Sequence, residues 1–316
     1  MAVRDAPPIP RTTGLDGWRP SHRLQRGFAL AAVITNAAIA VTGAVVRVTG
    51  SGLGCPTWPE CHPGSLVPVI REENSTFHQL IEFGNRTLTG VVLVASLGTF
   101  LLIWRARPRR RSLVWLAAAL PALVLFQAVW GGITVLFGLA WWTVAPHMLF
   151  SLGLLSVAVW VHQRLGETGD GPVVATVPRP LHLLAWATCG VLLLLCVVGT
   201  LVTAAGPHAG DSATARLDLS VRGLAQVHAD LMFTYLGLLV AFGVALVAIN
   251  APAVLRRRMW VLVGVTLAQG ALGIVQYQLG VPEVLVVLHV TGAVLLVTAA
   301  VRMLFATRTR TAATPA

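Results

Sequence analysis

The sequence contains no lysine, and all 23 of its basic residues are arginine. Only 11% of its 316 residues are charged, against about 25% in a typical soluble domain. This shortage of charge excludes an ordinary water-soluble protein, whose surface needs charged side chains. Hydrophobic residues make up 56% of the chain, so the composition predicts a protein that crosses a membrane several times.

Eight apolar runs are long enough to cross a bilayer, which takes about 20 helical residues. The arginines gather in alternate short loops, so the net charge of +11 fits the positive-inside rule better than nucleic-acid binding. We therefore expect a cell-membrane protein with both termini in the cytoplasm and with its first helix retained. The predicted spans are 27–47, 77–104, 113–137, 143–162, 181–204, 223–249, 259–279 and 284–305.

Two parts of the chain match one another without a gap. Gln127 aligns with Gln269 and His147 with His289, and two glycines between them keep the same register. Because each copy would hold four spans, both would start in the cytoplasm and form parallel repeats related by an axis along the membrane normal. The predicted fold is an all-α integral membrane protein whose eight transmembrane helices form two parallel-repeat four-helix bundles. Its expected parts are a cytoplasmic N-terminal tail (1–26), an N-terminal half (27–162) with an external loop (48–76), a cytoplasmic linker (163–180), a C-terminal half (181–305) and a cytoplasmic tail (306–316).

The external loop is rich in glycine and proline and contains the segment CPTWPEC. Cys55 and Cys61 would lie on the oxidising side of the membrane, which favours a disulfide between them. Covalent haem attachment needs a C-x-x-C-H spacing that this segment lacks. A metal site is the alternative, although the segment offers few further ligands. His62, which follows Cys61, is expected to be solvated.

The segment HQLIEFGNR, residues 78–86, opens the second span with ionisable groups four residues apart. His78, Glu82 and Arg86 would therefore share one face of a helix. Ionisable groups at membrane depth cost about 2.5–3.5 kcal/mol each, so they normally face a bundle interior and have a function. The alternative is that this face lies in the headgroup region, where polar groups cost little.

Four of the nine histidines lie near the external ends of even-numbered spans, namely His78, His147, His228 and His289. Any one of them alone would more often be an interior histidine satisfied by hydrogen bonds. The helix rise places all four in one layer of the outer leaflet. Imidazole is a common axial ligand of haem iron, and four-helix bundles hold cofactors between facing helices. We therefore expect one haem between His228 and His289 and a second site with His147 and His78.

This ordered set, with TGSGLGCP, IEFGNR and the three histidines that enter the fourth, sixth and eighth spans, resembles the haem A synthase family over nearly the whole chain. The resemblance implies an oxidoreductase that converts the C8 methyl group of haem O to the formyl group of haem A for cytochrome oxidase. It implies haem B on His228 and His289, substrate haem O in the N-terminal half, Glu82 as the catalytic carboxylate and a disulfide in the external loop. The expected partners are haem O, the farnesyltransferase that makes it, an electron donor or acceptor and the lipid bilayer, whereas self-association into a homo-oligomer is left open.

The sequence departs from this family at one position. Many members carry a haem-ligating histidine three residues after the glutamate, and here that position is Asn85. Because asparagine is a poor iron ligand, either His78 takes the role or His147 alone holds the substrate iron. Arg86 is expected to pair with Glu82 or to meet a haem propionate.

Two other function classes fit parts of the pattern. A di-haem electron carrier resembling cytochrome b561 quinol oxidoreductases would also pair histidines in bundles, but it would usually hold haems near both membrane faces. A parallel-repeat transporter would use Glu82 and Arg86 as a substrate or proton site and would bind no haem. Extraction of the pigment separates these classes from a haem A synthase.

Overall fold

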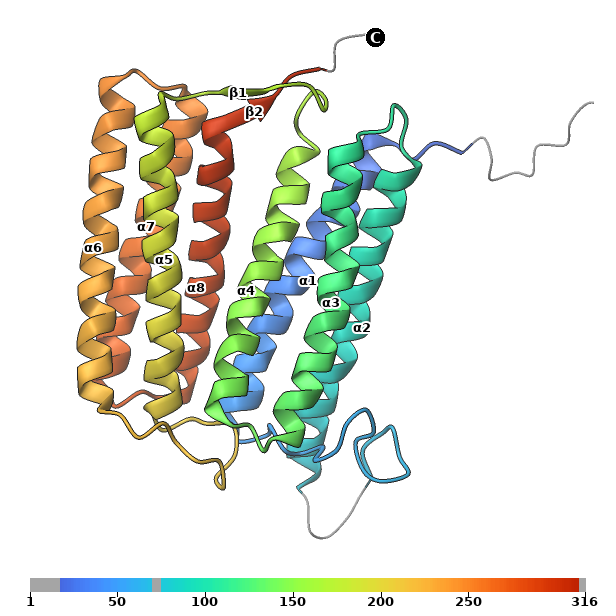
Figure 1. Ribbon diagram of the computed structural model, residues 1–316. Helices are drawn as coiled ribbons and strands as arrows, with labels where there is room; N and C mark the ends of the chain where they lie inside the picture. Colours follow the sequence, from blue (N-terminus) through green and yellow to red (C-terminus); the bar gives the residue numbers. More distant parts are fainter. Residues whose placement is uncertain (1–17, 70–74, 313–316) are drawn as a thin grey trace, which may run out of the picture.

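The computed structural model describes residues 18–69 and 75–312, and Figure 1 shows their helices in two groups side by side. Within these residues eight helices are long and apolar enough to span a membrane, which confirms the predicted all-α class. Residues 1–17 and 313–316 of the predicted tails, and residues 70–74 of the external loop, lie outside this description. The helices are α1 (His22–Val48), α2 (Thr76–Arg105), α3 (Arg111–Leu136), α4 (Trp141–Arg164), α5 (Arg179–Ala205), α6 (Val221–Ala248), α7 (Ala253–Gln278) and α8 (Glu283–Leu304).

The helices begin and end within a few residues of the predicted spans. Capping residues and glycines in the sequence explain several of these ends. Helices α1 and α6 begin after Ser21 and Ser220, whose side chains accept hydrogen bonds from backbone N–H groups of the first turn. Helices α3 and α7 end in matching turns, in which Gly138 and Gly280 have φ angles of 61° and 74°. Glycine adopts this left-handed conformation without the steric cost that a Cβ atom brings.

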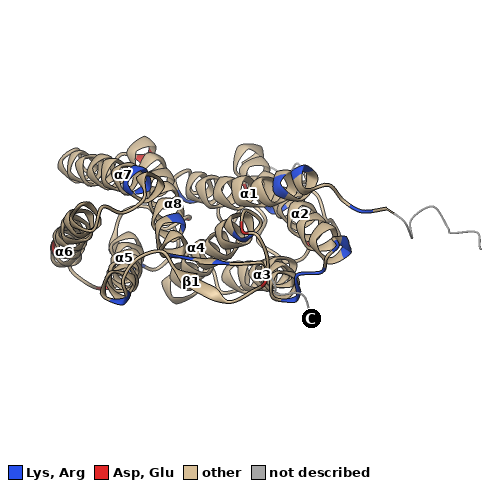
Figure 2. Ribbon diagram, turned by 90° about the horizontal axis from the view of Figure 1, so that it is seen from above, with Lys and Arg blue, Asp and Glu red and all other residues tan. Residues whose placement is uncertain are grey.

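Each group of four helices is a closed ring in which α2 lies diagonally opposite α4, and α6 diagonally opposite α8. The two rings meet where α8 packs against α1 and α4, as the view along the helices in Figure 2 shows. The helix ends that face the viewer in Figure 2 carry most of the arginines of the described residues, and we call this the arginine-rich end. The opposite end, which carries residues 49–69, is called the loop end.

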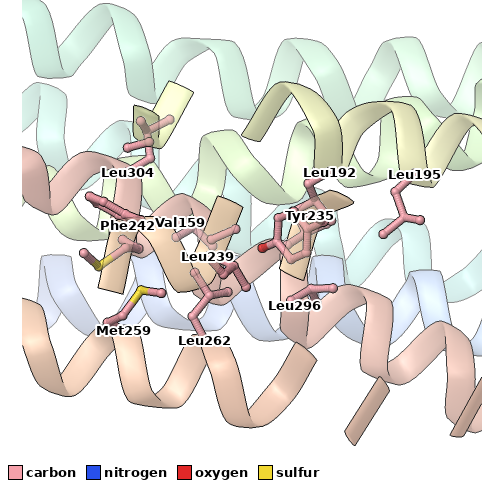
Figure 3. Packing of buried hydrophobic residues seen from close by; sticks show 14 of the residues in the cluster. Val159, Leu192, Leu195, Tyr235, Leu239, Phe242, Met259, Leu262, Leu296 and Leu304 are labelled. Atoms are coloured by element: carbon pink, nitrogen blue, oxygen red, sulfur yellow. The ribbon is translucent and has the colours of Figure 1, made fainter. Parts of the chain in front are cut away.

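The packing of buried side chains joins the two rings into one body. In the larger cluster, Val159 of α4 lies with Leu239 and Phe242 of α6 and with Leu296 of α8 (Figure 3). A second cluster lies within the N-terminal ring. Lipid tails are as apolar as these side chains, so close van der Waals packing rather than water exclusion holds the helices together.

The predicted cytoplasmic linker and C-terminal tail are not simple loops. Val173–Ala175 form strand β1 and Arg308–Arg310 form strand β2, and the two pair antiparallel with Val174 opposite Thr309. Three-residue strands are too short to show an alternating pattern, so the sequence could not reveal them. The pair crosses the arginine-rich end and connects the two halves (Figure 1).

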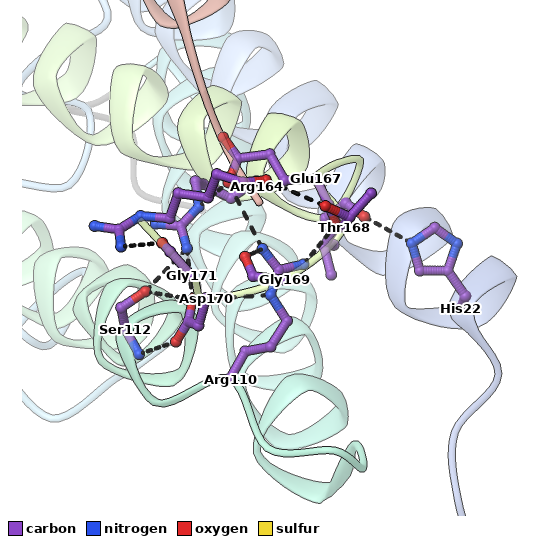
Figure 4. A network of polar contacts seen from close by, with 11 residues as sticks. His22, Arg110, Ser112, Arg164, Glu167, Thr168, Gly169, Asp170 and Gly171 are labelled. Atoms are coloured by element: carbon purple, nitrogen blue, oxygen red, sulfur yellow. Dashed lines mark hydrogen bonds and ion pairs between the residues drawn. The ribbon is translucent and has the colours of Figure 1, made fainter. Parts of the chain in front are cut away.

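A polar network fixes the linker to α3 and α4 (Figure 4). Asp170 accepts hydrogen bonds from the backbone N–H of Ser112 (2.8 Å), the hydroxyl of Ser112 (2.6 Å) and the guanidinium of Arg164 (2.7 Å). Arg164 also pairs with Glu167 at 2.5 Å. Burial alone would raise the pKa of Asp170, but the hydrogen bonds from Ser112 and the charge of Arg164 outweigh it and lower that pKa below 3.8.

We expect Asp170→Asn to destabilise the protein by about 2 kcal/mol at neutral pH, because charge-assisted hydrogen bonds are lost. A carboxylate with a lowered folded-state pKa stabilises the fold above its unfolded pKa, and this contribution disappears as the pH falls through the folded value. The difference from wild type in apparent Tm should therefore be full at pH 7 and shrink below pH 3.8. Asp218→Asn, at an exposed position, is the control; an equal loss in both variants would contradict the prediction.

Candidate functional site

His228 of α6 and His289 of α8 face one another across the C-terminal ring. Their ring centroids are 6.4 Å apart. Two metal–imidazole bonds of about 2 Å each, together with the distance from each nitrogen to its ring centre, require about this separation. The Nδ1 atoms of both rings are buried without a hydrogen-bond partner among the described residues. Unsatisfied buried nitrogens at this spacing fit a pair of axial ligands for one haem iron.

Glycines give these rings their space. A Cβ atom at Gly199 of α5 would lie 3.0 Å from Cε1 of His228, and one at Gly273 of α7 would lie 3.1 Å from Cε1 of His289. The hairpins α5–α6 and α7–α8 also pack more closely within themselves than against each other. The chemistry of the ligands, the separation of their rings and the looser packing between the hairpins therefore fit a flat macrocycle between the two hairpins.

The N-terminal half repeats one side of this arrangement. Gln127 donates a hydrogen bond to the carbonyl of His147 (3.2 Å), and Gln269 donates the equivalent bond to the carbonyl of His289 (2.8 Å). The Nδ1 of His147 is likewise buried without a hydrogen-bond partner among the described residues. A Cβ atom at the matching Gly131 would lie 3.3 Å from its Cε1. These matched contacts support the inference that the halves are repeats.

The structure does not bring His78 to His147 in the way that it pairs the other two histidines. His78 lies two residues after the start of α2, whereas His147 lies six residues after the start of α4. Its Nδ1 is 2.9 Å from the hydroxyl of Ser51, and no ring contact joins it to His147 within the described chain. Asn85, at the family's histidine position, accepts a hydrogen bond from the hydroxyl of Thr42 at 2.7 Å. His78 as an iron ligand therefore stays a prediction.

Glu82 and Arg86 form the ion pair that their spacing predicts. Arg86 Nη2 lies 2.6 Å from Oε1 of Glu82, and its Nε donates to the same oxygen at 3.0 Å. The other carboxylate oxygen accepts a hydrogen bond of 2.7 Å from the backbone N–H of Cys55. Glu82 is only 4% exposed. The carboxylate is thus enclosed by protein, and the alternative of a position at headgroup level stays open.

Arg86 binds the cysteine loop, residues 55–61, to helix α2. Its guanidinium donates to the backbone carbonyls of Cys55 (2.5 Å), Thr57 (2.8 Å) and Glu60 (3.3 Å). The loop contains the predicted disulfide between Cys55 and Cys61. One cation therefore fixes three backbone positions of the loop and, at the same time, the carboxylate of Glu82.

The expectation that His62 is solvated is wrong. Its side chain is 2% exposed, and its Nε2 lies 3.0 Å from Oε1 of Gln79 on α2. The loop folds back over the first turns of α2 and buries both residues. Gln79 lies in the polar segment 78–86, but nothing in the sequence indicated that it meets a loop residue.

Gly54 and Trp58 show how closely this loop is docked. A Cβ atom at Gly54 would lie 2.5 Å from the carbonyl oxygen of His78, so only glycine fits against the backbone of α2 there. The ring of Trp58 covers Gly132 of α3, where any larger residue would collide with it. The loop is thus held against two helices at the level of Glu82.

We expect Gly54→Ala to push the loop away from α2. This would weaken the hydrogen bond that the backbone N–H of Cys55 donates to the carboxylate of Glu82. Overpacking of this kind costs about 1–3 kcal/mol, because the backbone of α2 cannot move aside. The matched control is Gly84→Ala on α2, since nothing lies within 4 Å of a Cβ atom at that position. Apparent Tm and the rate of proteolysis within the loop are the measurements. Equal values for the two variants would show that the loop is not docked as described.

In comparisons with known proteins, the model of one family matches most of the chain. The profile of COX15-CtaA, described as cytochrome oxidase assembly protein, matches residues 26–301. The heme A synthase of Lysinibacillus sphaericus is 36% identical over 138 residues, which are 43% of this chain and 43% of that enzyme. The heme A synthase of Staphylococcus haemolyticus is 30% identical over 187 residues, which are 58% of this chain and 59% of that enzyme.

A differently named relative matches as well. The protoheme IX farnesyltransferase of Thermus thermophilus is 28% identical over 169 residues, which are 49% of this chain but only 26% of that enzyme. The matched part of the chain therefore spans about half the length of the heme A synthases and a quarter of the farnesyltransferase.

Proposed function

Because the chain belongs to the COX15-CtaA family of cytochrome oxidase assembly proteins, we propose that it is a haem A synthase, an oxidoreductase that converts the C8 methyl group of haem O to a formyl group. The observation that carries this proposal is the half-buried pair His228 and His289, whose rings are 6.4 Å apart and whose buried Nδ1 atoms are unsatisfied within the described residues. Relatives named heme A synthase add weight to it. A transporter would have no use for such a pair.

His228 and His289 are the proposed ligands of a haem B that stays bound. A bound haem supplies one-electron chemistry at its iron. The protein holds the two imidazoles on diagonal helices, and the glycines beside them leave the rings unobstructed. Gln269 fixes the backbone of α8 through the carbonyl of His289, so the position of that ligand is set by α7 as well.

The substrate haem O is proposed to bind in the N-terminal half, with His147 as its iron ligand. Support comes from the buried, unsatisfied Nδ1 of His147 and from Gly131 beside its ring. His78 is the second candidate, and it would have to give up its contact with Ser51 to reach an iron. Asn85 is engaged with Thr42 and is not proposed as a ligand.

Glu82 is proposed to act as a fixed negative charge rather than as a mobile base. Both of its oxygens already accept hydrogen bonds, from Arg86 and from the backbone of Cys55. Oxidation of the substrate methyl carbon withdraws electrons from it, and a carboxylate held nearby stabilises the positive charge that develops. Arg86 supplies the counter-charge of this carboxylate, and to meet a haem propionate it would have to give up a bond to a loop carbonyl.

The orientation in the membrane is part of the proposal. The arginine-rich end would face the cytoplasm by the positive-inside rule, and the proposed haem sites would lie near the outer face of the cell membrane. A farnesyltransferase resembling the Thermus thermophilus relative is the proposed source of the substrate. The electron donor or acceptor would approach from the outer side, where the sites lie.

Conversion of haem O to haem A in cells tests the proposed function. The chain is expressed in cells that make haem O but no haem A, and the haems are extracted and separated by chromatography. We expect haem A to form. A pigment that contains haem B alone would favour the electron-carrier class, and a colourless protein from haem-replete cells would favour the transporter class. Either result would refute the proposed function.

A further inference from the structure

A cavity of about 360 Å³ opens at the arginine-rich end, between the two halves. Its walls come from the ends of α1, α4, α7 and α8, from the linker and from β2, which are far apart in the sequence. Its volume falls in the range of about 300–1,000 Å³ that is usual for ligand sites. It lies at the opposite end of the helices from His228 and His289, so it is separate from the proposed haem chemistry.

The charge that lines this cavity is mostly positive. Arg26, Arg258, Arg302 and Arg308 reach it from four different elements. The carboxylate that lines it, Glu167, already pairs with Arg164 at 2.5 Å. Within residues 18–69 and 75–312, no carboxylate lies within 4 Å of any of the four guanidinium groups. This concentration of positive charge favours an anion as the ligand.

Two of these arginines are held in place before any ligand binds. Arg258 donates a hydrogen bond of 2.9 Å to the carbonyl of Arg302. The guanidinium of Arg308 lies 5.2 Å from the ring centre of Phe305, which in turn stacks on Trp160 at 4.6 Å. Burial, and then the charge of Arg310, lower the pKa of Arg308, and the negative charge of Glu167 does not outweigh them. Preorganised guanidinium groups bind phosphate oxygens with little loss of side-chain freedom.

We propose that this cavity is a binding site for a phosphate-bearing anion. Its other wall is apolar and includes Val159, Leu255 and Phe305, and it lies at the ends of membrane-spanning helices, where the positive-inside rule expects the cytoplasmic surface. A phosphate group attached to acyl chains matches both walls, so the headgroup of an anionic phospholipid fits better than free phosphate. The positive-inside rule explains why loops at this end are basic. It does not explain why four arginines from separate elements converge on one cavity.

Native mass spectrometry of the purified full chain tests the site with three probes: phosphatidylglycerol, phosphatidylcholine and inorganic phosphate. We expect one phosphatidylglycerol per chain at concentrations at which phosphatidylcholine does not bind. The variant Arg258→Gln with Arg302→Gln should weaken this binding about 30-fold, given about 1 kcal/mol per arginine near a lipid surface. The control, Arg257→Gln with Arg179→Gln, removes the same charge at exposed positions outside the cavity and should bind as wild type does.

The outcomes are distinct. Inorganic phosphate that binds alone and displaces phosphatidylglycerol would support the site and identify a soluble source for its anion. Equal weakening in the cavity variant and the control would overturn the proposal, because it would show attraction to the general charge of this end. If the first variant does not fold, Arg26→Gln with Arg308→Gln tests the same cavity.

Discussion

Replacing His289 with alanine is expected to remove the resident haem from the C-terminal half while the chain still folds. The imidazole of His289 faces that of His228 at 6.4 Å, and its loss would leave one axial position without a ligand. Loss of a residue that merely supports a metal ligand costs about 10- to 100-fold in metal affinity, so loss of the ligand itself should cost at least that. The haem B content per chain, measured by pyridine haemochrome after purification, should fall at least about tenfold.

The matched control is His182→Ala, in the same half but at the arginine-rich end, where His182 contacts the hydroxyl of Thr307. This control should retain haem B. His228→Ala should behave as His289→Ala does, because the two rings are proposed to share one iron. A wild-type haem B content in both His228→Ala and His289→Ala would exclude these two histidines as ligands.

The second large effect is expected at Glu82. Glu82→Gln keeps the size of the side chain but removes its charge and turns an N–H group toward Arg86. If the carboxylate stabilises charge on the substrate, conversion of haem O should fall about 10²- to 10³-fold, while haem B bound by His228 and His289 should remain. The measurement is the ratio of haem A to haem O in extracts, normalised to haem B. Conversion at the wild-type rate would remove Glu82 from the chemistry.

Arg86→Lys separates the charge of Glu82 from its role in holding the loop. Lysine keeps a positive charge beside Glu82, but it lacks the planar guanidinium that reaches the carbonyls of Cys55 and Thr57. If the loop contacts alone matter, Arg86→Lys should loosen the loop to proteolysis and reduce conversion as much as Glu82→Gln does. If the negative charge matters, Glu82→Gln should reduce conversion more while the loop stays as protected as in wild type.

The two halves differ in a way that suits different tasks. The C-terminal half presents two facing imidazoles with no hydrogen-bond partner for either Nδ1 among the described residues, which favours a haem that stays. The N-terminal half has Asn85 where many members of the family have a haem-ligating histidine. The buried carboxylate of Glu82 lies nearby on the same helix. A weaker hold on the iron suits a haem that must enter and leave. We therefore keep the assignment of resident haem and substrate haem to the two halves as a proposal.

Much of the fold followed from the sequence because its signals are local. Long apolar runs identify membrane helices by themselves, and the structure has a helix at each predicted span. The pairing of Glu82 with Arg86 followed from helical spacing alone. The pairing of His228 with His289 needed one further step, the helix rise along each span, which set both residues in one layer.

The contacts that the sequence did not reveal are tertiary. No local sequence feature indicated that the backbone N–H of Cys55 would donate a hydrogen bond to Glu82. None indicated that His62 would be buried against Gln79. Both contacts exist because a glycine- and proline-rich loop folds back on a helix that follows it. The pairing of β1 with β2 joins segments that are more than a hundred residues apart and that have no periodicity of their own. Such contacts depend on where the helices place the loops, which hydropathy does not report.

The imidazoles of His228 on α6 and His289 on α8 are proposed to hold one haem iron between them. Electron paramagnetic resonance of the oxidised, purified full chain tests it most directly, because the spin state of the iron reports its axial ligands. We predict a low-spin signal from a six-coordinate haem B with two histidine ligands, which Glu82→Gln leaves intact and His289→Ala abolishes. A haem B that is only high-spin, or a low-spin signal that survives in His289→Ala, would contradict the account.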